Sequence, residues 1–269
     1  MPNTPKQFPT LSETVDDRIL VRGRDLADDL MGRLTFTEMF LLDLHGEVPS
    51  AAHVRMVDLV LVTLMEHGVT PSTLAARLVL DGAPESTQGA IAAGLLAAGS
   101  RFLGVIEEVA AFLQRVVSQA DGLDGSADGT DGREALISAA ASRCVALARA
   151  RGERIPGFGH NLHHSEDPRV ERLTSLARKE GVYGPYLQAR AEVHAALNEQ
   201  SGRVLISNAA GVVGALLSDL GYQPREIRGF GILARCAGVF AHVVDEYNYP
   251  MARELWQRSH EAVGQDAKG

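Results

Sequence analysis

Glycine and proline divide this chain into consecutive segments of helical length, and that division is the strongest constraint on its fold. Turn signals such as Gly46, Gly68 and the run Gly82-Ala83-Pro84 separate one apolar stretch from the next. No segment alternates apolar and polar residues in the manner of a half-buried strand. Aromatic residues make up only 5% of the chain and hydrophobic residues 45%, a balance that suits closely packed helices. The sequence therefore predicts an all-α fold.

Local signals predict where several of these helices begin and end. Thr35 and Glu38 have the spacing of a capping box before an apolar run, and Pro168 can open a helix. A small-residue helix is expected over residues 90–103, where alanine and glycine would let neighbouring helices approach closely. Further helices are expected over residues 134–151, 170–181, 184–200, 203–220, 224–247 and 250–262.

Two stretches lack these patterns. Residues 1–33 are expected to be an N-terminal tail and lead-in. Residues 121–132 are rich in aspartate and glycine and are expected to form a surface loop. Their acidic residues do not predict a calcium site, because the EF-hand spacing and its closing glutamate are missing.

Charge and cysteine content exclude several classes of function. A net charge of −8 and a pI near 5.6 argue against a nucleic-acid surface. Cys144 and Cys236 are far apart and form no CxxC pair, so neither a disulfide framework nor a thiolate metal site is predicted. Residues 1–10 contain no apolar core of a signal peptide, and no run approaches the ~20 apolar residues of a membrane span. We expect a cytoplasmic protein with no membrane or nucleic-acid partner.

The most chemically loaded stretch runs from Arg154 to Arg169. Gly157 and Gly159 can take backbone angles that other residues avoid, and they let a bulky ligand approach the main chain. They lead directly to His160, whose imidazole can exchange a proton near neutral pH. Arg169 offers a planar fork suited to a carboxylate. The nearby His163 and His164 lack further ligands at workable spacing, so no metal site is expected.

This stretch resembles a known signature. The run Pro156-Gly157-Phe158-Gly159-His160, followed by Asp167-Pro168-Arg169, is similar to the PGFGH…DPR motif of the citrate synthase superfamily. Two other segments resemble that superfamily in the same order: residues 66–77, which include His67, and residues 234–242, which include Arg235. The resemblance covers roughly residues 34–247.

The resemblance implies an architecture and a class of ligand. It implies a large helical lobe formed by residues 34–103 and 211–269, a smaller mobile lobe formed by residues 104–210, and a homodimer or higher oligomer. An acyl group carried on coenzyme A and an oxo-acid would meet between the lobes. By position, His67, His160, Arg169 and Arg235 would hold the oxo-acid, with His160 as the catalytic residue. The backbone from Pro156 to Gly159, including Gly157 and Phe158, would receive coenzyme A.

Two departures from the superfamily pattern bear on the reaction. Residues 99–104, Gly-Ser-Arg-Phe-Leu-Gly, replace the turn that carries a histidine in synthases. They are similar to the citryl-CoA lyase module of ATP-citrate lyase, so Phe102 favours the lyase direction. Ala210 occupies the position of the family's catalytic aspartate, beside Asn208. Deprotonation of an acyl-CoA methyl group, or reprotonation of its enolate, therefore lacks its usual agent.

The sequence leaves several alternatives open. Glu107 or Glu108 could replace the missing carboxylate, or could simply be solvated helix residues. Asn208 could bind a ligand or cap a helix. Arg253 and Arg258 are the candidates for an arginine donated across a dimer interface. The leading hypothesis is a carbon–carbon lyase acting on acyl-CoA; the alternatives are a catalytically retired CoA-ester or dicarboxylate binding protein, and a thioester hydrolase.

Overall fold

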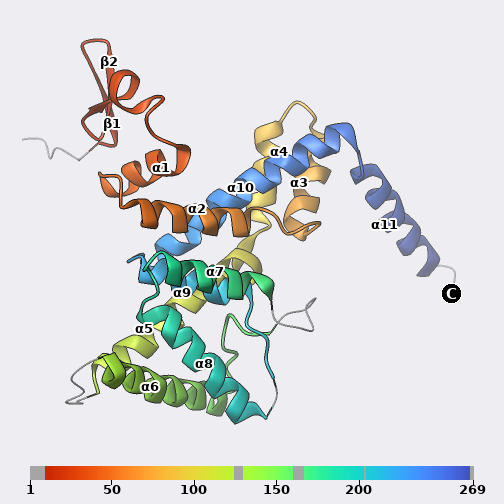
Figure 1. Cartoon of the computed structure of the whole chain (residues 1–269). Coiled ribbons are helices and arrows are strands. Elements are labelled where there is room, and N and C mark those ends of the chain that lie inside the picture. The colour runs from red at the N-terminus through yellow and green to blue at the C-terminus, as the bar shows by residue number, and fades with distance from the viewer. Residues whose placement is uncertain (1–9, 124–129, 160–166, 203, 267–269) are drawn as a thin grey trace, which may run out of the picture. The chain divides into compact units, whose positions relative to one another are not determined.

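Helices dominate the computed structural model, which describes residues 10–123, 130–159, 167–202 and 204–266 (Figure 1). The α-helices are α1 (Phe36–His45), α2 (Ala51–Met65), α3 (Pro71–Gly82), α4 (Thr87–Leu96), α5 (Gly104–Asp121), α6 (Thr130–Ala150), α7 (Pro168–Lys179), α8 (Pro185–Ser201), α9 (Ala209–Asp219), α10 (Pro224–Asn248) and α11 (Ala252–Asp266). Two short π-helical segments are η1 (Leu26–Leu30) and η2 (Gly99–Leu103). The predicted all-α class is confirmed.

The expected absence of strands is wrong for the N-terminal stretch. Strands β1 (Ser12–Val15), β2 (Arg18–Val21) and β3 (Arg24–Asp25) form a three-stranded antiparallel sheet in the order β1-β2-β3. Part of the expected tail is therefore an ordered hairpin structure. The strands have at most four residues each, and every residue of β1 is exposed, so they have no alternating apolar pattern to reveal them.

Tight two-residue turns build this sheet. Asp16 and Asp17, with φ of 47° and 64°, connect β1 to β2. Arg22 and Gly23, with φ of 50° and 76°, connect β2 to β3. Positive φ at both central residues is the geometry of hairpin turns whose twist matches the strands. The usual Asn-Gly or Asp-Gly signal is missing from both turns, which explains why the sequence did not predict them.

The predicted helix starts at Thr35 and Pro168 are confirmed. The Thr35 hydroxyl accepts a hydrogen bond from the Glu38 backbone N–H, and the Glu38 carboxylate accepts one from the Thr35 backbone N–H at 2.8 Å. Pro168 is the first residue of α7. Both starts depend on residues within one turn of each other, so the sequence alone identifies them.

Two predicted helices differ most from the structure in their limits. The helix expected over residues 203–220 begins at Ala209, because the Asn208 side chain caps it by accepting from the Gly211 backbone N–H. The helix expected over residues 90–103 is interrupted after Leu96, and η2 follows it. The break places Phe102 on a short separate turn.

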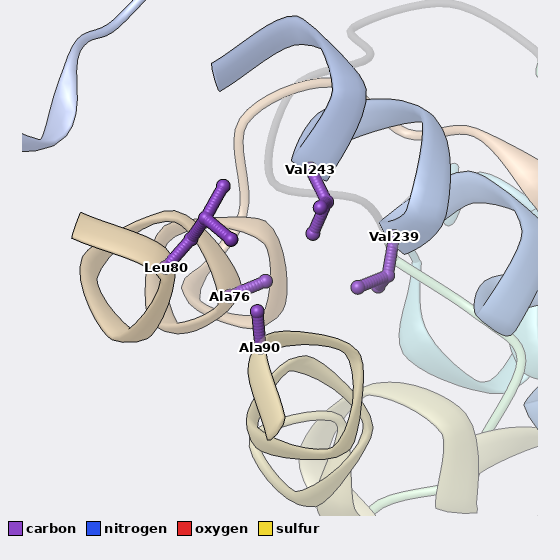
Figure 2. Close-up of a cluster of buried hydrophobic side chains, with 5 residues drawn as sticks. All are labelled: Ala76, Leu80, Ala90, Val239 and Val243. Atoms are coloured by element: carbon purple, nitrogen blue, oxygen red, sulfur yellow. The ribbon is translucent and has the colours of Figure 1, made fainter. Parts of the chain in front are cut away.

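Small and branched apolar side chains pack α3, α4 and α10 together (Figure 2). Ala76 and Leu80 of α3 and Ala90 of α4 face Val239 and Val243 of α10, and all five are buried. Small side chains at this junction let the helix backbones lie close together.

Gly238 of α10 shows how close the helix backbones come. A Cβ atom at Gly238 would lie 2.0 Å from the Met65 carbonyl oxygen at the end of α2, which no side chain could tolerate. Gly238 belongs to the 234–242 segment that resembles the superfamily. It therefore fixes the position of that segment against the residues that follow Met65.

By length and composition alone, α10 could cross a membrane, although no such run was expected from the sequence. Half of its most apolar window is buried inside the fold. The described chain divides into two compact units, one ending at Asp58 and the other beginning at Leu59. The predicted lobes, 34–103 with 211–269 and 104–210, stay a prediction.

Asp219 caps α8 from the end of α9. Its carboxylate accepts hydrogen bonds from the backbone N–H groups of Gly184 at 3.1 Å, Tyr186 at 2.9 Å and Leu187 at 3.0 Å. These are donors that the first turn of a helix leaves without partners. Burial raises the pKa of Asp219 to about 6, against the opposing effect of these three donors.

Asp219→Asn should lower the free energy of unfolding at pH 7.5 by about 1–3 kcal/mol, because an amide NH₂ would face backbone donors. The wild type should also become more stable as the pH falls from about 6 towards 4, since the folded state holds the Asp219 proton more tightly than the unfolded chain. Urea unfolding at several pH values measures both effects. The exposed Asp121→Asn is the control, and a pH dependence shared by all three proteins would contradict the assignment.

Candidate active site

Two adjoining cavities lie within the unit that begins at Leu59. The small cavity has a volume of about 220 Å³ and the large cavity about 860 Å³. Both are lined by His67, Thr70, Arg101, Phe102, Val105 and Asn208. Arg169, Arg235 and Ala210 line only the small cavity, whereas the segment from Pro156 to Gly159 lines only the large one. The structure thus brings together the predicted site residues that it describes.

Asp167 holds in place two residues that line the small cavity, Arg169 and Ala209. It is fully buried, and it caps α7 by accepting from the Arg169 backbone N–H at 3.0 Å. It also accepts from the Ala209 backbone N–H, the first residue of α9, at 3.1 Å. Burial alone would raise the pKa of Asp167, but the bonds from Arg169 and Ala209 outweigh it and hold the pKa below its ordinary value. One ionised carboxylate therefore joins the first turns of two helices.

Asp167 also fixes the Arg169 side chain. Its two carboxylate oxygens accept from Arg169 Nε at 2.9 Å and from Nη2 at 2.8 Å, a bidentate pair that sets the plane of the guanidinium. The Arg169 side chain stays 30% exposed and lines the small cavity. Arg169 can therefore still donate to a ligand from its remaining nitrogen, although Asp167 balances its charge.

Arg235 differs from Arg169 because the described residues provide no partner for one of its nitrogens. Arg235 lies on α10, is only 8% exposed and lines the small cavity, and its Nη1 is buried without a hydrogen bond to any described residue. Burial lowers its pKa, with Glu66 acting in the opposite direction. A buried guanidinium nitrogen without a partner is costly unless a ligand supplies an acceptor. This atom is the strongest indication of an anion site.

His67 lies between the two cavities. Partial burial and the positive charges of Arg169 and Arg235 lower its pKa, although it keeps an exposed edge. The imidazole is therefore neutral at pH 7 and can donate one hydrogen bond or accept one from a ligand. The neighbouring Glu66 holds the backbone in place by accepting from the N–H groups of His67 at 2.9 Å and Gly68 at 2.6 Å.

The segments 66–77 and 234–242 are tied together by a polar network. Arg77 donates to His242 Nδ1 at 3.1 Å, so the other ring nitrogen of His242 carries the proton and donates to Glu66 at 3.1 Å. Arg77 also donates to the buried Glu246 at 2.6 Å. The network fixes Glu66, and through Glu66 the backbone of His67.

The segment before the predicted catalytic histidine pairs with the start of α9. Gly157 has φ of 89°, and a Cβ atom there would lie 2.9 Å from the Gly211 Cα. Its carbonyl oxygen accepts from the Asn208 backbone N–H at 3.1 Å, and Phe158 forms a β-bridge with Ser207. Only glycine satisfies both the dihedral and the space at position 157.

The Asn208 side chain forms hydrogen bonds to the backbone of two segments, the start of α9 and Gly159. Its Oδ1 caps α9 by accepting from the Gly211 backbone N–H at 3.2 Å, and its Nδ2 donates to the Gly159 carbonyl oxygen at 2.9 Å. The structure therefore supports the helix-cap interpretation. Asn208 also lines both cavities, so a role toward a ligand stays a prediction.

Two arginines without a predicted role in the site also line the cavities. Arg101, next to Phe102, lines both cavities, and Arg154 lines the large one; both are exposed. Neither forms an ion pair with a carboxylate in the part of the chain that the structure describes. Arg154 lies two residues before Pro156, so its place in the motif was the available signal.

The residues weighed as replacements for the missing aspartate lie in different places. Ala210 lines the small cavity, where Glu66 is the only carboxylate among the described lining residues. Glu107 lines neither cavity and pairs with Arg228 at 3.5 Å, so it is not positioned to replace the aspartate. Glu108 lines the large cavity.

Several other predicted residues remain outside the site or outside the description. Arg253 pairs with Asp81, and Arg258 pairs with Glu254, at exposed positions. His160, His163 and His164 lie outside the described residues. Within residues 10–123, 130–159, 167–202 and 204–266, no group of three histidine, cysteine, aspartate or glutamate side chains could hold a metal ion.

The chain is similar to proteins of known family. Residues 9–255 match the family described as "Citrate synthase, C-terminal domain". The citryl-CoA lyase structure from Hydrogenobacter thermophilus is 30% identical with a TM-score of 0.76, over 90% of this chain and 87% of that one. The ATP citrate lyase of Methanothrix soehngenii, solved with citrate and coenzyme A, has a TM-score of 0.72 at 22% identity, over 92% of this chain and 40% of that one.

A curated relative adds a sequence comparison. "Putative citrate synthase 2" of Mycobacterium tuberculosis is 26% identical over 79% of this chain and 52% of its own length. The chain thus spans about half the length of the curated relatives of this name. The family match over residues 9–255 includes every described residue that lines the two cavities.

Asp167→Asn should lower the free energy of unfolding by about 2–4 kcal/mol, because a buried ion pair would lose one partner. Asp81→Asn removes the carboxylate of the exposed pair with Arg253 and should change it by less than about 1 kcal/mol. Denaturant unfolding of the two variants gives the comparison. Equal losses would show that Asp167 does not join α7 and α9 as described.

Proposed function

This chain belongs to the citrate synthase family, and on that premise we propose that it cleaves, or in reverse forms, a carbon–carbon bond between an acyl-CoA and an oxo-acid. The lyase direction is favoured. The similarity to the citryl-CoA lyase of Hydrogenobacter thermophilus over most of both chains supports this choice. Phe102, which lines both cavities, also supports it, because residues 99–104 are similar to the citryl-CoA lyase module of ATP-citrate lyase.

The observation that carries the proposal is the Nη1 atom of Arg235. It is buried, it has no partner among the described residues, and its side chain lines the small cavity. Arg169 and His67 line the same cavity. A carboxylate bound there would accept charge-assisted hydrogen bonds from two guanidinium groups. His67 would form a hydrogen bond with the carbonyl or hydroxyl oxygen on the neighbouring carbon of the acid.

The large cavity suits the coenzyme A portion of such a substrate. The backbone of Pro156–Gly159 lines it, and Arg101 and Arg154 add positive charge. Coenzyme A carries phosphates, which arginines bind by charge-assisted hydrogen bonds. Because the two cavities share lining residues, a thioester in the large cavity would place its acid portion in the small one.

The reaction proposed for these groups starts from a 3-carboxy-3-hydroxyacyl-CoA. His160 accepts the proton of the substrate hydroxyl, the oxygen becomes a carbonyl, and the bond between C2 and C3 breaks. The electron pair of that bond passes to the thioester side as an enolate, and the oxo-acid stays on Arg169 and Arg235. The enolate then takes a proton from water, since the methyl group of Ala210 has none to give.

A second copy of the chain is the proposed protein partner. On α10, Ile232, Phe240, Val244 and Tyr247 are 41%, 51%, 41% and 54% exposed and fall on one helical face. Such a stripe on a helix suits packing against another apolar helix face. The same stripe on a second copy would complete a symmetric pair of helices.

Ala210 also supports a second candidate function, a catalytically retired protein that binds CoA esters. The cavities and the arginines that would bind such an ester do not depend on a carboxylate at position 210. Binding without turnover is therefore compatible with the same geometry.

Purified protein given citryl-CoA and alkyl 3-carboxy-3-hydroxyacyl-CoAs should release an oxo-acid, detected by a coupled reductase. Arg235→Met should weaken ester binding by roughly 10–100-fold, because a charge-assisted hydrogen bond contributes about 1.5–3 kcal/mol. Arg172→Met, at an exposed position outside both cavities, should leave binding unchanged. Ester binding with no release of oxo-acid would favour the retired protein.

Ala210→Asp should raise the rate of cleavage by about 10²-fold or more, the usual contribution of a positioned acid or base. Ala210→Asn has nearly the same shape without the proton, and it should not raise the rate. Single-turnover measurements with saturating protein separate this effect from binding. If Asn and Asp accelerate equally, the gain comes from shape, and the missing proton donor does not limit the reaction.

A further inference from the structure

Part of the wall of the large cavity is a short backbone ribbon, formed by residues 157–159 and residues 205–208 side by side. The Gly159 backbone N–H donates to the Ile206 carbonyl oxygen at 2.7 Å. The first segment lines the large cavity along its whole length. A two-stranded pair this short has marginal stability by itself and needs packing against another element. The position of this wall therefore depends on what holds the ribbon.

Three polar side chains of α8 hold the second segment of the ribbon. Arg190, His194 and Asn198 are spaced four residues apart, so they lie on one face of the helix. Arg190 Nη1 donates to the Ser207 hydroxyl at 2.9 Å. His194 Nε2 bonds to the Leu205 carbonyl oxygen, and Asn198 Oδ1 accepts from the Leu205 backbone N–H at 2.7 Å. These bonds attach the second segment to α8.

His194 contacts the first segment as well. Its imidazole stacks on the Phe158 ring, with 5.5 Å between the ring centroids and 22° between the ring planes. Phe158 is only 7% exposed, so its ring is packed inside the fold. A carbonyl oxygen can only accept, so Nε2 of His194 carries the proton in the bond to Leu205. One side chain thus holds the ring of one segment and the backbone of the other.

The start of α9 is held by contacts that do not involve α8. The Asp167 carboxylate accepts from the Ala209 backbone N–H at 3.1 Å. The Asn208 side chain caps the same helix by accepting from the Gly211 N–H at 3.2 Å. Loss of the His194 contacts should therefore loosen the ribbon and leave the bond between Ala209 and Asp167 in place.

We propose that His194 is a positioning residue for the coenzyme A portion of the substrate, because it holds the ribbon in the conformation that receives that portion. Arg190 and Asn198 support it, and none of the three is among the described residues that line the cavities. A ligand that binds only the held conformation loses apparent affinity as fewer molecules occupy that conformation. The inference rests on the proposed function and adds residues on which its binding site depends.

Calorimetric titration with coenzyme A tests the effect on binding. His194→Ala should weaken the binding at least about fivefold, because a hydrogen bond and a ring contact are both lost. Where an ester is cleaved, its KM should rise by the same factor while kcat stays as in the wild type, since saturating ester restores the held conformation. An unchanged Kd, or a fall in kcat with an unchanged KM, overturns the inference.

Hydrogen exchange measured by NMR gives a readout that needs no ligand. In His194→Ala the Gly159 amide should exchange at least about fivefold faster, because the ribbon opens more often. The Ala209 amide, which donates to Asp167, should keep its rate. An unchanged rate at Gly159, or an equal acceleration of both amides, contradicts a role specific to the ribbon.

A matched control lies on the same helix. Gln200 Nε2 donates to the Ser142 carbonyl oxygen of α6 at 3.0 Å, so Gln200→Ala also removes a side-chain donor from a backbone carbonyl. It should leave coenzyme A binding and Gly159 exchange unchanged. His194→Gln keeps a donor for Leu205 and should recover part of the affinity that His194→Ala loses. If Gln200→Ala weakens binding equally, the effect is one of general stability and the inference falls.

A second variant covers a failure of His194→Ala to fold. Asn198→Ala removes the other bond to Leu205, and it should weaken coenzyme A binding and speed Gly159 exchange in the same way. Unchanged values in that variant would then overturn the inference.

Failure of the proposed function gives a different pattern. If the wild type cleaves an ester and His194→Ala binds coenzyme A equally well, only the inference falls. If His194→Ala loses binding but no protein cleaves an ester, the inference holds and the proposed lyase activity does not. If the wild type binds no coenzyme A, both fall.

Discussion

The buried carboxylate of Asp167 is the interaction on which the rest of the site depends. Its oxygens accept hydrogen bonds from the backbone N–H of Arg169, from the side chain of Arg169 and from the backbone N–H of Ala209. A fully buried aspartate is tolerable only when such donors surround it. Because the donors come from the first turns of α7 and α9, the same contact that stabilises the charge sets the distance between Arg169 and the helix that carries Ala210.

Close backbone contacts also hold in place the residues that line the large cavity. Gly157 lies against Gly211 and pairs with Asn208, and the Asn208 side chain returns to Gly159. On the other side, Arg77, His242 and Glu66 form a chain of hydrogen bonds that fixes His67. The motif residues therefore divide into those that face a cavity and those that hold the first group in place.

Ala210 removes a catalytic carboxylate from the small cavity but leaves its ligand-binding arginines in place. The small cavity keeps the arginines that a carboxylate needs, whereas position 210 contributes only a methyl group to its wall. A carboxylate there would have added negative charge to a cavity that Glu66 already lines. Its absence changes the protons available to the reaction.

The sequence by itself determined the helical class, the capping box at Thr35, the helix start at Pro168 and the grouping of His67, Arg169 and Arg235. The helix starts follow from residues within one helical turn, whereas the grouping of His67, Arg169 and Arg235 was expected only from the resemblance of three separate segments to the citrate synthase superfamily. Only the tertiary structure revealed the short strands of residues 12–25, the Asp219 cap of α8 and the placement of Arg101. It also decided that Glu107 faces Arg228 and that Arg235 Nη1 has no partner among the described residues. Burial and pairing between distant segments decide these features, and neither is encoded in the spacing of neighbouring residues.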